Sequence, residues 1–78
     1  MATRKTLIKS RAGVRLQHIE HLDRQQVVRS SWRLTTMRQS QPRTFADELE
    51  AEDAFDMEVI ASLTDPIIID MQRRGLVD

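Results

Sequence analysis

Two histidines and a glutamate lie within four residues of one another, in the segment HIEH at positions 18–21. Zinc sites use such side chains, and the metalloprotease pattern places two histidines four residues apart on one helix face with a glutamate between them. Here His18 and His21 are three residues apart, and the chain has no cysteine and no further histidine to complete a site. We therefore expect no metal. The histidines should be polar groups on an exposed helix face, and the alternative is a pH-sensitive contact with an acidic partner.

A pair of carboxylates is the second candidate for chemistry. Glu52 and Asp56 are about one helical turn apart, inside an apolar stripe on the helical wheel. That stripe comprises Phe45, Leu49, Val59 and Leu63. Such a pair could serve as acid and base or bind a hard cation, but no nucleophile beside a histidine, glycine-rich loop or calcium-binding spacing accompanies it. Because an ionised carboxylate facing a core is unfavourable without a partner, we expect both to pair with arginines of this chain or another.

A stripe of basic residues is the third candidate. On a helix drawn through the first half of the chain, four arginines and one histidine fall within about 60° of one another. They are Arg11, Arg15, His18, Arg29 and Arg33. Three explanations remain open: an exposed charged face, a match to the acidic helix inside a hairpin, or a surface for phosphates or an acidic protein.

Trp32 lies on another side of the same expected helix, together with Val14, His21 and Val28. A helix with apolar groups on two sides has more than one packing partner. Either the C-terminal segment covers this second patch, or Trp32 anchors a protein interface, where tryptophan is enriched.

The elements that would position these side chains are predicted to be helices. Residues 14–39 contain no glycine or proline, and several apolar residues fall on one side at helical spacing. These are Leu16, Ile19, Val27, Leu34 and Met37. Pro42 interrupts the pattern, and Thr44 is a suitable N-cap for a second helix that extends to Leu63.

A short third helix is predicted over residues 66–74. Pro66 suits a first helical turn, and Gly75 suits the residue that closes a helix. The three consecutive isoleucines in PIIID are also compatible with a strand, because β-branched residues favour pleated surfaces. The stop signals on either side favour the helix.

The predicted fold class is all-α. Residues 1–13 show no clear period and predict a basic flexible arm, and residues 14–78 predict a single small helical domain. Because the turn at residues 40–43 is short, the two longer helices should be antiparallel neighbours. The expected architecture is therefore a helical hairpin of two longer antiparallel helices plus a short C-terminal helix, with a basic N-terminal arm.

Charge is divided along the chain. Residues 1–43 contain ten bases and two acids, a net charge of +8, whereas residues 44–78 contain two bases and ten acids, a net charge of −8. A chain of 78 residues with only two phenylalanines and one tryptophan has a thin core, which favours docking or self-association. The lack of cysteine excludes a disulfide scaffold and favours the cytoplasm or an intracellularly assembled particle, and no segment resembles a signal peptide or membrane span.

These features predict a small non-enzymatic binding protein without cofactors or membrane contact. We expect a structural or assembly subunit that docks on a larger protein complex or self-associates. The alternative is a nucleic-acid-binding regulator with the basic half on phosphates and the acidic half on a protein, an antitoxin-like layout of charge that lacks any ribbon-helix-helix, zipper or zinc-finger pattern. The residues expected at the contact are Arg11, Arg15, Arg29, Trp32 and Arg33 on the first helix and Glu52 and Asp56 on the second.

Overall fold

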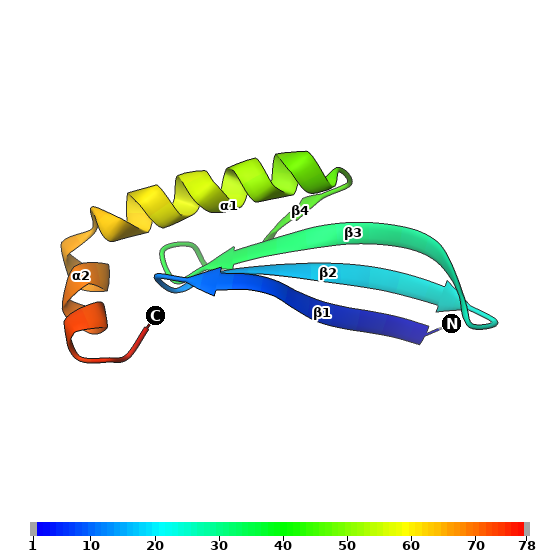
Figure 1. Cartoon of the computed structure of the whole chain (residues 1–78), viewed down its shortest axis with the longest axis horizontal. Helices are drawn as coiled ribbons and strands as arrows, with labels where there is room; N and C mark the ends of the chain where they lie inside the picture. The colour runs from blue at the N-terminus through cyan, green and yellow to red at the C-terminus, as the bar shows by residue number, and fades with distance from the viewer. Residues whose placement is uncertain (1, 78) are drawn as a thin grey trace.

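A four-stranded antiparallel sheet followed by two helices makes up the structure, a computed structural model that describes residues 2–77 (Figure 1). The strands, in the spatial order β1-β2-β3-β4, are β1 (Ala2–Arg11), β2 (Val14–Asp23), β3 (Gln26–Thr36) and β4 (Arg43–Phe45), and the helices are α1 (Glu48–Leu63) and α2 (Pro66–Arg73). This is an α+β fold, so the predicted all-α helical hairpin is wrong. The expected first helix is the β2–β3 hairpin, and the expected basic arm is strand β1, paired with β2.

Two-residue turns connect the three long strands. The β1–β2 turn contains Ala12 (φ 54°) and Gly13 (φ 78°), and the β2–β3 turn contains Arg24 (φ 53°) and Gln25 (φ 68°). Positive φ at both central residues is typical of type I′ turns, whose twist matches that of the flanking strands. Such turns usually carry Asn-Gly or Asp-Gly. The pairs Ala-Gly and Arg-Gln therefore gave the sequence no strong hairpin signal.

Apolar residues on both faces of the sheet explain why strands resembled a helix. Leu16 is fully buried beneath α1, and Ile19, with 5% of its surface exposed, lies on the opposite face of β2. Residues three apart lie on one side of a helix but on opposite sides of a strand. The spacing of Leu16 and Ile19 therefore fitted a helix although each residue packs on a different face.

Helix α1 confirms that the second half of the chain is helical as far as Leu63, but its start differs from the prediction. Asp47 is the N-cap, and its side chain accepts a hydrogen bond from the backbone N–H of Glu50. Thr44 does not cap the helix, because it lies in β4 and pairs with Arg33.

The short third helix is confirmed as α2. The Asp65 side chain accepts a hydrogen bond from the Ile67 N–H, Pro66 occupies the first turn, and Gly75 follows the helix with a φ of 73°. The strand alternative for these residues is therefore wrong. Among residues 2–77, no helix is long and apolar enough to cross a membrane.

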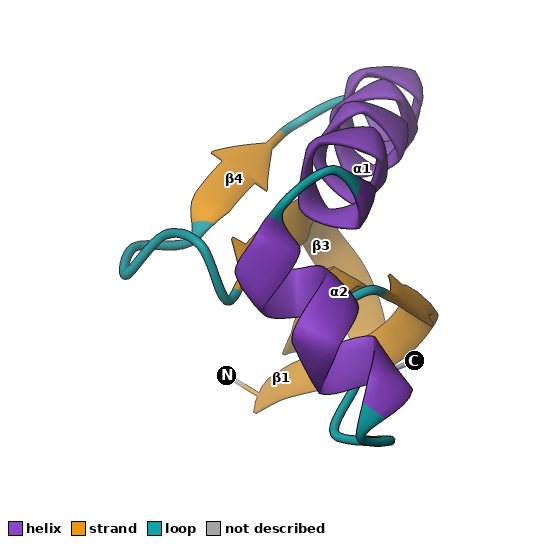
Figure 2. Ribbon diagram, turned by 90° about the vertical axis from the view of Figure 1, so that its left-hand side faces the viewer, coloured by secondary structure: helices purple, strands orange, loops and turns teal. Residues whose placement is uncertain are grey.

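The core lies between the sheet and α1. It comprises Val14, Leu16 and Leu34 from the sheet and Ala51, Phe55 and Val59 from α1. Helix α1 contacts β2, β3 and β4. Helix α2 contacts chiefly α1 and lies at one end of the sheet, as both ribbon views show (Figures 1 and 2). Neither helix packs on the opposite face of the sheet. The molecule therefore has one covered sheet face and one open sheet face.

Candidate binding surface

The strand register defines which side chains lie on the open sheet face. Leu16 and Leu34 pair directly beneath α1, so their neighbours Arg15 and Arg33 point away from the helix. The side chains of the three long strands on this open sheet face are Thr3, Lys5, Leu7 and Ser10 of β1, Arg15, Gln17, Ile19, His21 and Asp23 of β2, and Gln26, Arg29, Ser31, Arg33 and Thr35 of β3.

Four bases and one acid, Asp23 at the hairpin end of β2, are present in this set. None of Lys5, Arg15, Arg29 and Arg33 forms an ion pair with another residue of the range 2–77. Arg33 is half-buried, and its Nε is enclosed without a hydrogen-bond partner among the same residues. Several basic side chains on one surface that form no ion pairs favour an acidic ligand. The open sheet face is therefore a candidate binding surface.

Most bases on the other side of the sheet already have acidic partners. Arg4 Nη2 lies 2.8 Å from Glu20 Oε1, and Lys9 Nζ lies 3.5 Å from Glu52 Oε1. Lys9 also lies over the Phe55 ring, 5.5 Å from its centroid. These contacts fix β1 against its neighbours and leave little positive charge for an external ligand.

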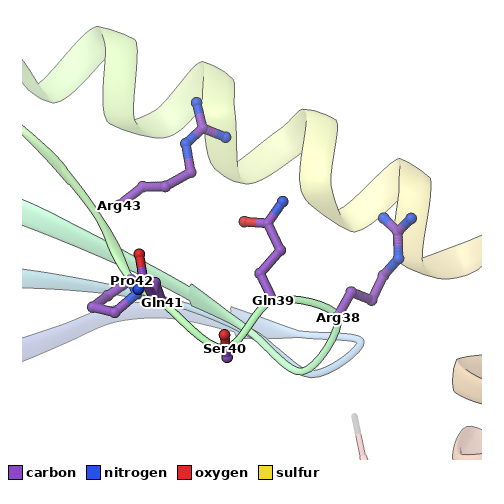
Figure 3. Close-up of a pocket in the computed structure, with 6 residues that line it drawn as sticks. All are labelled: Arg38, Gln39, Ser40, Gln41, Pro42 and Arg43. Atoms are coloured by element: carbon purple, nitrogen blue, oxygen red, sulfur yellow. The ribbon is translucent and has the colours of Figure 1, made fainter.

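A surface hollow of about 480 Å³ at the β3–β4 loop, residues 38–43, has a structural role. Figure 3 shows Arg38 and Arg43 reaching toward α1. Arg38 lies 3.8 Å from Glu58 and 3.3 Å from Asp65, and Arg43 lies 3.7 Å from Glu58. These ion pairs fasten the loop to the helix, so we do not assign the hollow as a binding site.

Helix α1 presents a second candidate surface on its solvent side. Three large apolar residues there are mostly exposed: Leu49 (70%), Met57 (69%) and Ile60 (61%). Exposed acids that form no ion pair with residues 2–77 lie between them, namely Glu50, Asp53 and Asp56. We call these six residues the outer face of α1. Its mixture of apolar and acidic groups is suited to a partner that is both apolar and basic.

The structure brings together three of the four arginines of the predicted basic stripe. Arg15, Arg29 and Arg33 share the open sheet face, but Arg11 pairs with Val14 on the covered side. There Arg11 lines a hollow together with Asp56, without an ion pair between them. The sequence reasoning missed Lys5, although its position on the open sheet face follows from the two-residue alternation of a strand.

Trp32 lies on the covered side of the sheet, away from the three arginines. Its ring stacks on His18 with 4.8 Å between centroids, and it packs against the core beside Phe45. Helix α2 does not cover it, because α2 lies at the end of the sheet and contacts chiefly α1. Trp32 therefore packs at the edge of the core. Its role in a protein contact stays a prediction.

The two predicted carboxylates have different environments. Glu52 is half-buried and pairs with Lys9 of β1, so its partner is a lysine in place of the expected arginine. Asp56 is exposed and belongs to the outer face of α1. His18 and His21 lie on opposite faces of the sheet, and no group of three metal-ligating side chains occurs in the described range.

Comparison with known proteins gave no match: no protein-family model, no curated protein and no solved structure is similar to this chain. The chemistry of the surfaces is therefore the basis for a proposed function.

Proposed function

We propose that this chain is a non-enzymatic assembly subunit that binds an acidic protein surface through its open sheet face. The observation that carries the proposal is the set of four bases, Lys5, Arg15, Arg29 and Arg33, on a face that has a single acid, Asp23, and no covering helix. A half-exposed apolar side chain, Leu7, lies on the same face. Apolar and arginine groups together are typical of protein interfaces. A cytoplasmic location belongs to the proposal because it suits a chain without cysteine.

The second candidate function is nucleic-acid binding, which the same bases favour because phosphate contacts depend on lysine and arginine. The aromatic residues argue against the binding of single strands. Trp32, Phe45 and Phe55 all lie on the side of the sheet that faces α1. Proteins that bind single strands usually stack bases on exposed aromatic rings, and the open sheet face offers no Phe, Tyr or Trp for this purpose. Together with the apolar Leu7 on the same face, this favours an acidic protein as the ligand.

A direct test compares two probes, polyglutamate and mixed-sequence duplex DNA, at low and moderate salt. The test variant is Arg29→Glu/Arg33→Glu, and the matched control is Arg24→Glu/Arg73→Glu, which makes the same change in net charge outside the open sheet face. We expect wild type and control to bind polyglutamate and the test variant to lose at least about tenfold in affinity. Circular dichroism checks that the fold is retained.

The alternative outcomes are also informative. Tight DNA binding with a steep salt dependence, lost in the test variant, would favour the nucleic-acid function. Binding of neither probe at low salt, or equal loss in the control, would contradict the assignment of the open sheet face.

A further inference from the structure

The acidic ligand of the open sheet face has a candidate within the chain itself. We propose that the outer face of α1 of one copy docks on the open sheet face of a second copy. This inference rests on the proposed function, because it identifies the acidic protein surface that the open sheet face binds.

The two surfaces are complementary in charge. The outer face of α1 carries Glu50, Asp53 and Asp56, all exposed and free of ion pairs with residues 2–77. The open sheet face carries one acid, Asp23, and four bases that are equally free of ion pairs in that range, namely Lys5, Arg15, Arg29 and Arg33. The whole chain has a formal net charge of zero, so repeated docking of copies would accumulate no net charge. Opposite potentials of this kind both attract the partners and fix their orientation.

Apolar groups also match across the proposed contact. Leu49, Met57 and Ile60 are each more than three-fifths exposed on α1. The open sheet face offers the half-exposed Leu7 and the aliphatic stems of its long basic side chains. Docking would remove the apolar groups of both surfaces from water, and this would supply the stabilisation that charge pairs alone seldom give.

The dimensions of the two surfaces agree. From Leu49 to Ile60, α1 rises about 16 Å at 1.5 Å per residue. Arg15 pairs with Thr35, and from Thr35 to Arg29 strand β3 extends about 20 Å at 3.4 Å per residue. The three acids from Glu50 to Asp56 span about 9 Å of this rise, so one docked helix can place them against about half of the row of bases.

The docking must take place between molecules. Helix α1 packs on the covered face of its own sheet, so its outer face and the open sheet face point in opposite directions. Each copy thus offers one donor and one acceptor surface, and the contact is heterologous, which produces a closed ring or an open filament. Pairing through the free edge of β1 is less favourable, since Arg4, Lys5, Lys9 and Arg11 would bring like charges together.

The test reverses the sign of the charges on one surface at a time. The first variant is Arg29→Glu/Arg33→Glu on the open sheet face, and the second is Asp53→Lys/Asp56→Lys on the outer face of α1. Sedimentation and light scattering across a wide range of concentrations measure self-association. We expect wild type to associate with a strong salt dependence, and each variant alone to associate at least about tenfold more weakly.

Rescue distinguishes specific docking from general repulsion. An equimolar mixture of the two variants restores complementary surfaces, as does the chain that carries all four substitutions, so both should associate as wild type does. The control Arg24→Glu/Arg73→Glu should also remain associated. Circular dichroism checks that each variant is folded. A variant that does not fold is replaced by one with glutamine or asparagine at the same positions.

Three results would overturn the inference: a wild-type chain that stays monomeric at all concentrations, variants that show no rescue, or a control that loses association equally. A monomer that still binds polyglutamate through Arg29 and Arg33 would refute self-docking and leave the proposed function standing. A monomer that binds no acidic probe would refute both.

Discussion

The two faces of the sheet differ in what surrounds their charged side chains. On the covered face, Lys9 pairs with Glu52, and nearby Arg38 and Arg43 pair with Glu58 of α1. On the open sheet face, Arg29 and Arg33 have no acidic partner among residues 2–77. Most bases on the covered face, Arg11 excepted, thus have an acidic partner, whereas those on the open sheet face have none among the described residues.

This difference separates residues that hold the fold from residues available for a partner. A helix lying over a sheet contributes both apolar burial and counter-charges, so positions on the covered face are constrained by folding. Apart from the buried Ile19, positions on the open sheet face keep their side chains at least partly accessible. Substitutions on the two faces should therefore affect stability very differently. Two of the following comparisons test this, and a third tests the turns that join the strands.

The largest expected effect is a contrast between two leucines. Leu16 is fully buried beneath α1, whereas Leu7 on the open sheet face is 49% exposed. Leu16→Ala should lower the free energy of unfolding by about 3 kcal/mol through lost burial and a cavity, and Leu7→Ala by less than about 1 kcal/mol. Urea unfolding at low protein concentration measures both values. Equal losses would show that another element covers the open sheet face.

An intermediate effect is expected at the two hairpin turns. A Cβ on Gly13 would lie 2.8 Å from Met37 Sδ at a φ of 78°, so Gly13→Ala should destabilise the chain by about 1–2 kcal/mol. The β2–β3 turn holds Gln25 at a φ of 68°, where glycine avoids the steric cost, so Gln25→Gly should stabilise by about 0.5 kcal/mol. Thermal unfolding of both variants measures whether each change in stability has the expected sign. A neutral Gly13→Ala would mean that the first turn does not need positive φ.

The smallest expected effect concerns the charges themselves. Glu58→Gln removes the partner of Arg38 and Arg43, and because both arginines are more than one-third exposed the loss should be only about 0.5–1 kcal/mol. Arg33→Gln on the open sheet face breaks no ion pair and should change stability by no more than a few tenths, about 0.3 kcal/mol. Chemical denaturation compares them directly. A greater loss for Arg33→Gln would contradict the assignment of the open sheet face as unpaired.

The helical half was predictable because its signals are local. Asp65, Pro66 and Gly75 give α2 its start and end through hydrogen bonds and backbone angles within a few residues. The first half had no such signals, because its turns lack the usual Asn-Gly pair and Leu16 and Ile19 imitate helical spacing. The strands depend on pairing between distant segments, which local patterns describe poorly.

The candidate surface was also predictable in part. Arg15, Arg29 and Arg33 are grouped by alternation in strands as well as by the helical wheel, so the error in fold did not separate them. The error did misplace Arg11 and Trp32, which lie on the covered side, and it concealed Lys5 in a supposed arm.

By itself, the sequence determined the separation of charge, with ten of the twelve bases before residue 44 and ten of the twelve acids after it, and the two helices of the acidic half. The tertiary structure alone decided that the basic half forms strands, which bases α1 neutralises and which remain on an open face. The physical reason is that strand pairing and helix packing are long-range contacts, so the environment of a side chain depends on residues far from it in the chain.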